Sequence, residues 1–149
     1  MNPRDRLKLL GAGLVGAAAL SARADSAGSP AGSHWQVVVQ ISDSLDQAHE
    51  GLVNIQNVLA IDPGIKFIVV GYGKAIGFLR NGTQTPTGAL FSGLIGDLAN
   101  LGVEFRACKN TLDFLHIPAS DLVLEASLVQ AGAYEIIRLQ TLGWHYLKP

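Results

Sequence analysis

Apolar and polar positions alternate along the chain in two rhythms, one typical of strands and one typical of helices. Residues 35–41 read WQVVVQI, a run rich in β-branched side chains of the kind buried on both faces of a parallel sheet. The next apolar positions recur at steps of three and four, which predicts an amphipathic helix of about four turns. These positions are Leu45, Ala48, Leu52, Ile55 and Leu59. The domain is therefore predicted to begin as a strand followed by a helix.

The alternation continues to the end of the chain. Further strands are predicted at 66–70, 103–107, 128–130 and 144–147, and further helices at 74–80, 90–101, 111–115 and from Gly132 onward. In the last helix we expect Tyr134, Ile137 and Leu139 to face the core. Alternating strands and helices joined by right-handed crossovers favour a flavodoxin-like α/β fold. We therefore expect a three-layer α/β/α sandwich around a mostly parallel sheet of about five strands.

The first residues have the order of regions found in a secretory signal. A basic stretch at 4–8 precedes the apolar run LLGAGLVGAAAL, and the small residues Ala22 and Ala24 follow. The run is shorter than the roughly 20 residues that span a bilayer, although an uncleaved membrane anchor is the alternative interpretation. We expect cleavage after Ala24 and export to the periplasm. This divides the chain into a signal peptide (1–24), a flexible Ser/Gly/Pro-rich lead (25–34) and one α/β domain (35–149).

Composition and charge narrow the classes of partner. Of the 149 residues, 48 % are hydrophobic and 15 % are charged, which excludes a wholly disordered chain. The 11 basic and 12 acidic residues are unevenly placed, because the first 24 positions hold four of the basic residues and one of the acidic ones. The remaining domain is mildly acidic and has no basic cluster. We therefore expect neither nucleic acid nor a membrane surface as its partner.

Candidate chemistry is sparse and gathers at the predicted carboxyl ends of the strands. Ligands bind at this edge of open α/β sheets. Four segments follow predicted strands: 42–43, 71–73, 108–110 and 131–132. From them we predict binding residues Asp43, Gly71, Tyr72, Gly73, Lys109 and Asn110. The four histidines are scattered and the glycines at 71, 73 and 77 do not match a dinucleotide fingerprint, so we predict no metal and no cofactor.

Cys108 is the single cysteine of the chain and has no internal partner for a disulfide. It is predicted to stand at the end of a strand, directly before a helix. Unsatisfied N–H groups at the start of a helix, together with Lys109, would stabilise a thiolate and lower the pKa of this thiol. Two other interpretations stay open. The cysteine can be a small buried apolar residue, or it can form a disulfide with a second chain.

Residues 102–112, GVEFRACKNTL, resemble the G-V-x-F-x-x-C-x-N-T-L segment of DsrE/DsrF-like proteins, a family associated with intracellular sulfur handling. The similarity is greatest to an exported, little-characterised branch of that family. It extends over about 35–149, and its other blocks lie at 52–57, 69–73, 131–135 and 139–146.

The resemblance implies a parallel α/β sandwich that often forms homo-oligomers. It also implies that Cys108 carries sulfur as a persulfide between a donor and an acceptor protein, so that the chain is at most a sulfurtransferase-like carrier. Export departs from the cytoplasmic relay members and leaves the partners undefined. The alternative function is a non-catalytic exported module that binds a small ligand or a partner and has a structural cysteine.

Overall fold

A five-stranded, all-parallel sheet forms the centre of the computed structural model, which describes residues 35–149. In the order β4-β3-β2-β1-β5, the strands are Ala126–Val129, Glu104–Cys108, Lys66–Gly71, Gln36–Ile41 and His145–Leu147. The parallel sheet confirms the predicted fold class. The predicted signal peptide (1–24) and lead (25–34) lie outside the described residues.

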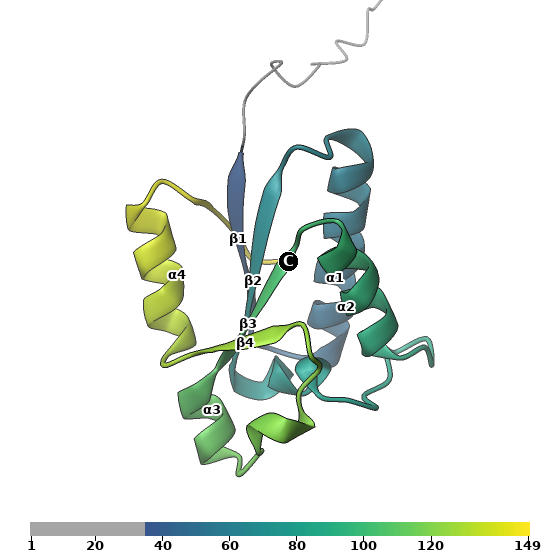
Figure 1. The fold of residues 1–149 in the computed structure, drawn as a ribbon, viewed down its shortest axis with the longest axis vertical. Coiled ribbons are helices and arrows are strands. Elements are labelled where there is room, and N and C mark those ends of the chain that lie inside the picture. Colours follow the sequence, from purple (N-terminus) through teal and green to yellow (C-terminus); the bar gives the residue numbers. More distant parts are fainter. Residues whose placement is uncertain (1–34) are drawn as a thin grey trace, which may run out of the picture.

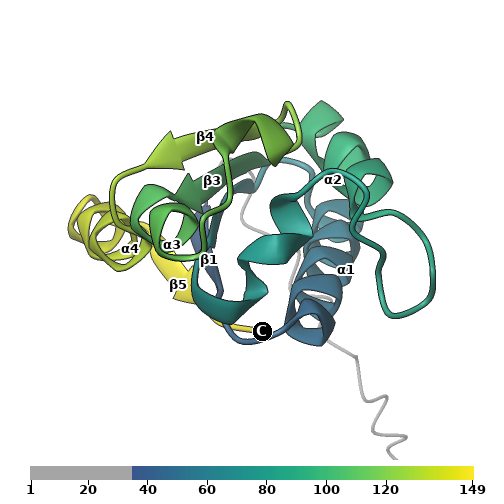
Figure 2. The same cartoon turned by 90° about the horizontal axis from the view of Figure 1, so that it is seen from below.

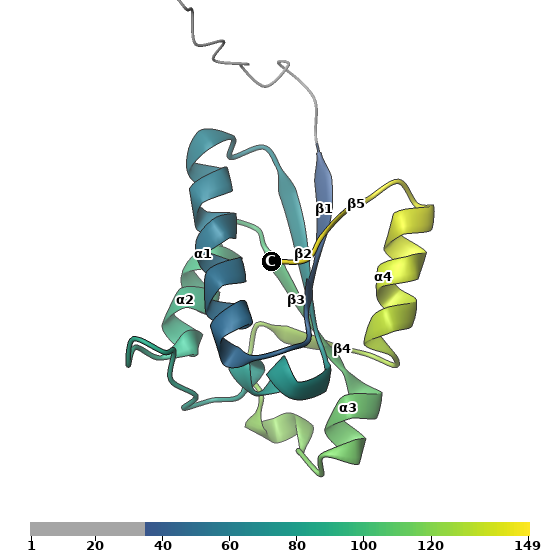
Figure 3. The ribbon, with the colours of Figure 1, turned by 180° about the vertical axis from the view of Figure 1, so that it is seen from behind.

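Helices cover both faces of this sheet (Figures 1 and 3). α1 (Leu45–Ile61) and α2 (Phe91–Asn100) lie on one face, and α4 (Gly132–Thr141) lies on the other. The short α3 (Lys109–Phe114) lies beyond the carboxyl ends of the strands, at the bottom of Figure 1. Two 3-10 segments, η1 (Gly73–Leu79) and η2 (Ala119–Asp121), complete the connections. Within residues 35–149, none of the helices combines the length and the apolar sequence needed to cross a membrane.

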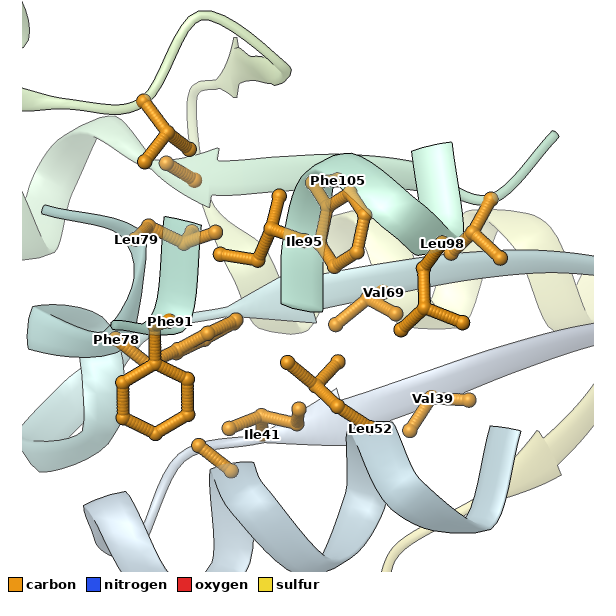
Figure 4. Close-up of a cluster of buried hydrophobic side chains, with 14 of the residues drawn as sticks. Val39, Ile41, Leu52, Val69, Phe78, Leu79, Phe91, Ile95, Leu98 and Phe105 are labelled. Atoms are coloured by element: carbon orange, nitrogen blue, oxygen red, sulfur yellow. The ribbon is translucent and has the colours of Figure 1, made fainter. Parts of the chain in front are cut away.

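The larger core lies between the sheet and the α1/α2 layer (Figure 4). Val39, Val69 and Phe105 project from the strands, and Leu52 and Ile95 reach them from the two helices. Phe78 and Phe91 pack edge to face, with ring centroids 6.0 Å apart. Aromatic rings in this geometry stabilise each other beyond the area that they bury. The core therefore fixes η1 against the sheet, which positions the turn at 71–73.

A smaller core lies between α4 and the sheet. Ile136 and Leu139 pack there on Val38, Ile68 and Val70 of the sheet.

Tyr134 and Ile137, which we expected to face inward, are instead 67 % and 60 % exposed. Glu135 occupies the inward face in their place and is buried. Its charge is balanced by Arg106 and Arg138, so a charged residue can occupy a position that periodicity assigns to solvent.

Two elements, β4 and α3, begin two residues earlier than expected. β4 begins at Ala126 and ends at Val129, whereas we predicted a strand at 128–130. Its register follows from pairing with β3, where Phe105 faces Ala126 and Cys108 faces Val129. Because this edge strand is half exposed, its own residues have only a weak strand pattern. α3 begins at Lys109, two residues before the predicted start.

Candidate functional site

The chain leaves the carboxyl ends of the neighbouring strands β3 and β4 over opposite faces of the sheet. After β3 the chain passes over the α1/α2 face, where the Val123 N–H donates to the Leu79 carbonyl at 2.9 Å. After β4 the chain crosses the opposite face through α4. Connections that diverge from neighbouring parallel strands leave a crevice, which is where open α/β sheets bind ligands. Cys108 stands at this point as the last residue of β3.

Hydrogen-bond donors surround the Cys108 sulfur, although the residue is only 5 % exposed. Burial acts to raise the pKa of the thiol. The Thr111 hydroxyl and the backbone N–H groups of Gly132, Thr111 and Asn110 act in the opposite direction. Together these hydrogen bonds outweigh burial and hold the pKa of Cys108 below its ordinary value. The site therefore favours a thiolate, the nucleophilic form of cysteine.

The donors come from two segments, 110–111 and Gly132, that are linked with the turn after β2 at this edge of the sheet. The Gly73 N–H donates to the Thr111 hydroxyl oxygen at 3.2 Å, so the hydroxyl proton remains available for the sulfur. The Asn110 N–H donates to the Gln130 carbonyl at 3.2 Å, and the Gln130 amide donates to the Asn110 side chain at 2.7 Å. These contacts connect the ends of β2, β3 and β4 around Cys108.

Glycine at two positions permits the close approach of these segments. A Cβ at Gly132 would lie 2.8 Å from Cδ1 of Tyr72 and 3.1 Å from its Cβ, which is too close for either residue to keep its place. Gly73 has a φ of +59° and lies against the carbonyl of Ser42. Glycine adopts this conformation without steric cost. The glycines thus bring both the Gly132 N–H and the turn after β2 to the sulfur.

A cavity of about 320 Å³ lies beside this cluster, between α3 and the start of η1. Its lining residues are Gly73, Lys74, Asn110, Thr111, Phe114 and Leu115. Asn110 and Thr111 belong both to the cavity wall and to the set of donors around Cys108. Phe114 is 82 % exposed at its rim. The cavity thus shares two of its wall residues with the surroundings of the thiol, and its volume suits a small substrate.

Comparison with known proteins agrees with this architecture. The model of the DsrE/DsrF-like family matches residues 36–149. The chain belongs to this family. It is 30 % identical to MTH1491 of Methanobacterium thermoautotrophicum, a protein of unknown function, with a TM-score of 0.69 over 77 % of this chain and 99 % of that one. No protein of curated function matches the chain.

A second solved structure, the YchN protein of E. coli, supports the fold alone. It shares 13 % sequence identity with this chain, with a TM-score of 0.60 over 76 % of this chain and 96 % of YchN. The predicted membership of the DsrE/DsrF-like family is thus confirmed by the family model, and the fold by the solved structures.

The structure of this DsrE/DsrF-like protein brings some of the predicted binding residues together at Cys108. Gly71 ends β2 and Tyr72 packs on Gly132, while Gly73 and Asn110 join the hydrogen bonds described above.

Lys109 and Asp43 are engaged elsewhere. The Lys109 ammonium lies 2.6 Å from Asp113, along the surface of α3. Asp43 lies beyond β1 and pairs with Lys148 at 2.8 Å, and this contact with Lys148, helped by the Ser42 hydroxyl, lowers the pKa of its carboxyl. The stabilisation of the Cys108 thiolate therefore comes from hydrogen-bond donors.

Sequence reasoning missed Thr111 and the cavity wall formed by Phe114 and Leu115. A signal for Thr111 exists, because it stands three residues after Cys108, on the first turn of a helix that starts at Lys109. Within residues 35–149 there is no group of three or more His, Cys, Asp or Glu side chains that could hold a metal ion.

Proposed function

We propose that this protein carries sulfur as a persulfide on Cys108. The observation that carries the proposal is the position of Cys108 at the end of β3, directly before α3, where hydrogen bonds from Thr111, Gly132 and Asn110 hold the pKa of its buried thiol below the ordinary value. Membership of the DsrE/DsrF-like family favours a sulfur-relay role in general terms. The match to the family model does not identify the atom that holds the sulfur; the resemblance of residues 102–112 and the local chemistry support Cys108 for that part.

The transfer needs no external oxidant or reductant. The Cys108 thiolate attacks the outer sulfur of a donor R–S–SH, and the S–S bond of the donor breaks as a new S–S bond forms on Cys108. R–S⁻ leaves with the electron pair of the broken bond, and the transferred sulfur keeps its proton. In the second step an acceptor thiolate attacks this outer sulfur, and Cys108 leaves as a thiolate. The hydrogen bonds at Cys108 stabilise the same anion at the start of the first step and at the end of the second.

A single cysteine suits this role. A second thiol in the same chain could attack the persulfide and release its sulfur while a disulfide forms. The chain contains one cysteine, so it has no internal thiol that could discharge the carrier in this way. Since Cys108 is only 5 % exposed, we expect transfer to require a local opening at the edge of the sheet.

The intact mass of the protein after treatment with inorganic polysulfide tests the proposal. We expect a gain of about 32 Da, one sulfur atom, that a thiol reductant reverses. Cys108→Ser is the matched control and should gain nothing. A wild-type protein that gains no mass, or a serine variant that gains as much, would contradict the proposal.

A second candidate function is a binding module in which Cys108 is only structural. The burial of the side chain favours it, because free cysteine is often a small core residue. Alkylation of the folded protein separates the two. A thiol that reacts only after unfolding supports the binding module, whereas a thiol that reacts in the folded state supports the sulfur carrier.

Export to the periplasm and self-association are further parts of the proposal. The pattern at 4–24 supports export, and the family resemblance supports a homo-oligomer. An exported protein whose N-terminus is Asp25, and a sedimentation mass that is a multiple of the chain mass, are the expected results. An intact residue 1 in the exported form would instead favour the uncleaved anchor.

A further inference from the structure

The cavity between α3 and the start of η1 has the properties of a site for a small molecule. Its volume of about 320 Å³ is at the lower end of the range of small-ligand sites. Phe114 at the end of α3 and Leu115 directly after it are 82 % and 44 % exposed and provide an apolar wall. Figure 2 shows α3 in the view onto the carboxyl ends of the strands. Exposed apolar side chains around a hollow are typical of a surface that a ligand covers. A folded protein partner would need a far larger area of contact than this cavity provides.

One positive charge stands in the wall of the cavity. Lys74 is exposed, and none of the ion pairs within residues 35–149 includes it. Asp43 lies within reach of its charge but is already paired with Lys148. Asn110 accepts from Gln130 through its amide oxygen, so its amide N–H groups are free to donate. The polar part of the wall therefore presents donors and a cation, which suit an anionic group.

We propose that this cavity binds a small organic persulfide that carries a carboxylate, and that this molecule is the sulfur donor for Cys108. The carbon part would pack on Phe114 and Leu115, and the carboxylate would pair with Lys74. The sulfane sulfur would then lie toward Asn110 and Thr111, the two wall residues that also contact the Cys108 sulfur. The inference rests on the sulfur-carrier function proposed above and names the class of its donor. The leaving thiolate R–S⁻ departs with the same carboxylate.

Two aromatic disulfides that differ in charge test the site, and no persulfide is needed. Dithiobis(nitrobenzoate) is anionic and dithiodipyridine is neutral, and both release a coloured thiol when a thiolate breaks their S–S bond. The measured quantity is the ratio of the two rate constants for Cys108 in the folded protein. Any change in the pKa of Cys108 affects both reactions alike, so the ratio isolates the contribution of charge in the cavity.

Lys74→Glu should lower the ratio of anionic to neutral rate constants by about three- to tenfold, because it replaces attraction by repulsion at a partly exposed site. Lys66→Glu is the matched control, since Lys66 is also exposed but starts β2 at the opposite edge of the sheet. It should leave the ratio unchanged. High salt should reduce the preference of the wild type for the anionic probe.

Leu115→Trp provides a second variant, which fills the cavity and should slow both probes. Ile61→Trp, at an 84 % exposed position that ends α1, is its control and should slow neither. An unchanged ratio in Lys74→Glu, with Cys108 reactive to both probes, would overturn the anionic site and leave the carrier function intact. A folded protein that reacts with neither probe would overturn both. A charge preference without persulfide formation would support an anion-binding cavity but contradict both the carrier function and the role of its ligand as a sulfur donor.

Discussion

Burial and hydrogen bonding act on the Cys108 thiol in opposite directions. Removal of a thiolate from water is unfavourable, but the low dielectric that causes this cost also strengthens each hydrogen bond to the anion. At Cys108 the donors outweigh the burial. A thiol of this kind can be both protected from solvent and ionised, which is what a carrier of a labile sulfur atom requires.

Removal of the Thr111 hydroxyl tests this balance. In Thr111→Val we expect the pKa of Cys108 to rise, because the variant keeps the shape of the side chain but loses a hydrogen-bond donor to the sulfur. The rate of alkylation by iodoacetamide at neutral pH should fall by about three- to tenfold, in proportion to the thiolate fraction. Measured against pH, the inflection of that rate should move upward.

The conservative variant separates this effect from a loss of packing. Thr111→Ser keeps the hydroxyl, including its capacity to accept from Gly73, and should retain the wild-type pH profile. A profile in Thr111→Val that overlies the wild type would show that the hydroxyl does not stabilise the thiolate.

At the scale of elements, Gly132 joins the start of α4 to the turn after β2. Gly132→Ala would place its Cβ 2.8 Å from Cδ1 of Tyr72, so either α4 or the tyrosine must move. We expect a loss of about 1–3 kcal/mol in the free energy of unfolding, measured by urea denaturation. The Gly132 N–H should also move away from the sulfur, so the pKa of Cys108 should rise.

Two further variants test whether the loss of stability in Gly132→Ala comes from the clash with Tyr72. Gly93→Ala, inside α2 with nothing within 4 Å of the added Cβ, should be neutral or slightly stabilising. Tyr72→Ala removes Cδ1 and Cγ, the ring atoms that the new Cβ would meet at 2.8 and 3.1 Å, and keeps only the Cβ at 3.1 Å. The double variant should therefore lose less stability than the sum of the two single changes, and simple additivity would contradict a direct clash.

The pattern of apolar residues predicts most of these elements but only part of the site. β1, α1 and β2 are confirmed because their apolar periodicity matches the core that they form. On α4 the prediction is confirmed for Leu139, which is buried, and wrong for Tyr134 and Ile137. Glu135 is buried there by pairing with arginines, and a one-dimensional pattern cannot show such pairing. The Gly132 N–H reaches Cys108 from the start of α4, and that proximity depends on the order of β3 and β4 in the sheet. The cavity likewise depends on how α3 lies against η1.

At the scale of the whole molecule, a group of charged side chains ties the α4 layer to the sheet. Glu135 of α4 is paired with Arg106 of β3 and, at 2.8 Å, with Arg138. Arg106 also contacts Glu104 at 2.7 Å. Glu135 is 7 % exposed, so removal of its charge would leave Arg106 with a weaker set of partners in a half-buried position. The loss of one partner of such a pair costs more than the pair itself contributes.

The stability of the whole protein should therefore depend on pH through Glu135. The hydrogen bond from Arg138 lowers the pKa of this carboxyl, burial opposes the change, and Arg106 adds to the lowering. A carboxyl whose pKa is lower in the folded than in the unfolded state stabilises the fold above its unfolded pKa, and that contribution is lost as pH falls through the folded pKa.

In Glu135→Gln we expect a loss of about 1–3 kcal/mol at neutral pH and a smaller difference from the wild type below about pH 4. Thermal unfolding between pH 3 and 7 measures both quantities. Glu50→Gln, at an exposed position on α1, should follow the wild-type curve throughout. Parallel curves for Glu135→Gln and the wild type at every pH would mean that the variant lost only packing. In that case the charge of Glu135 would not join α4 to the sheet, and the position of the Gly132 N–H would depend on the contact with Tyr72 and on the small core under α4.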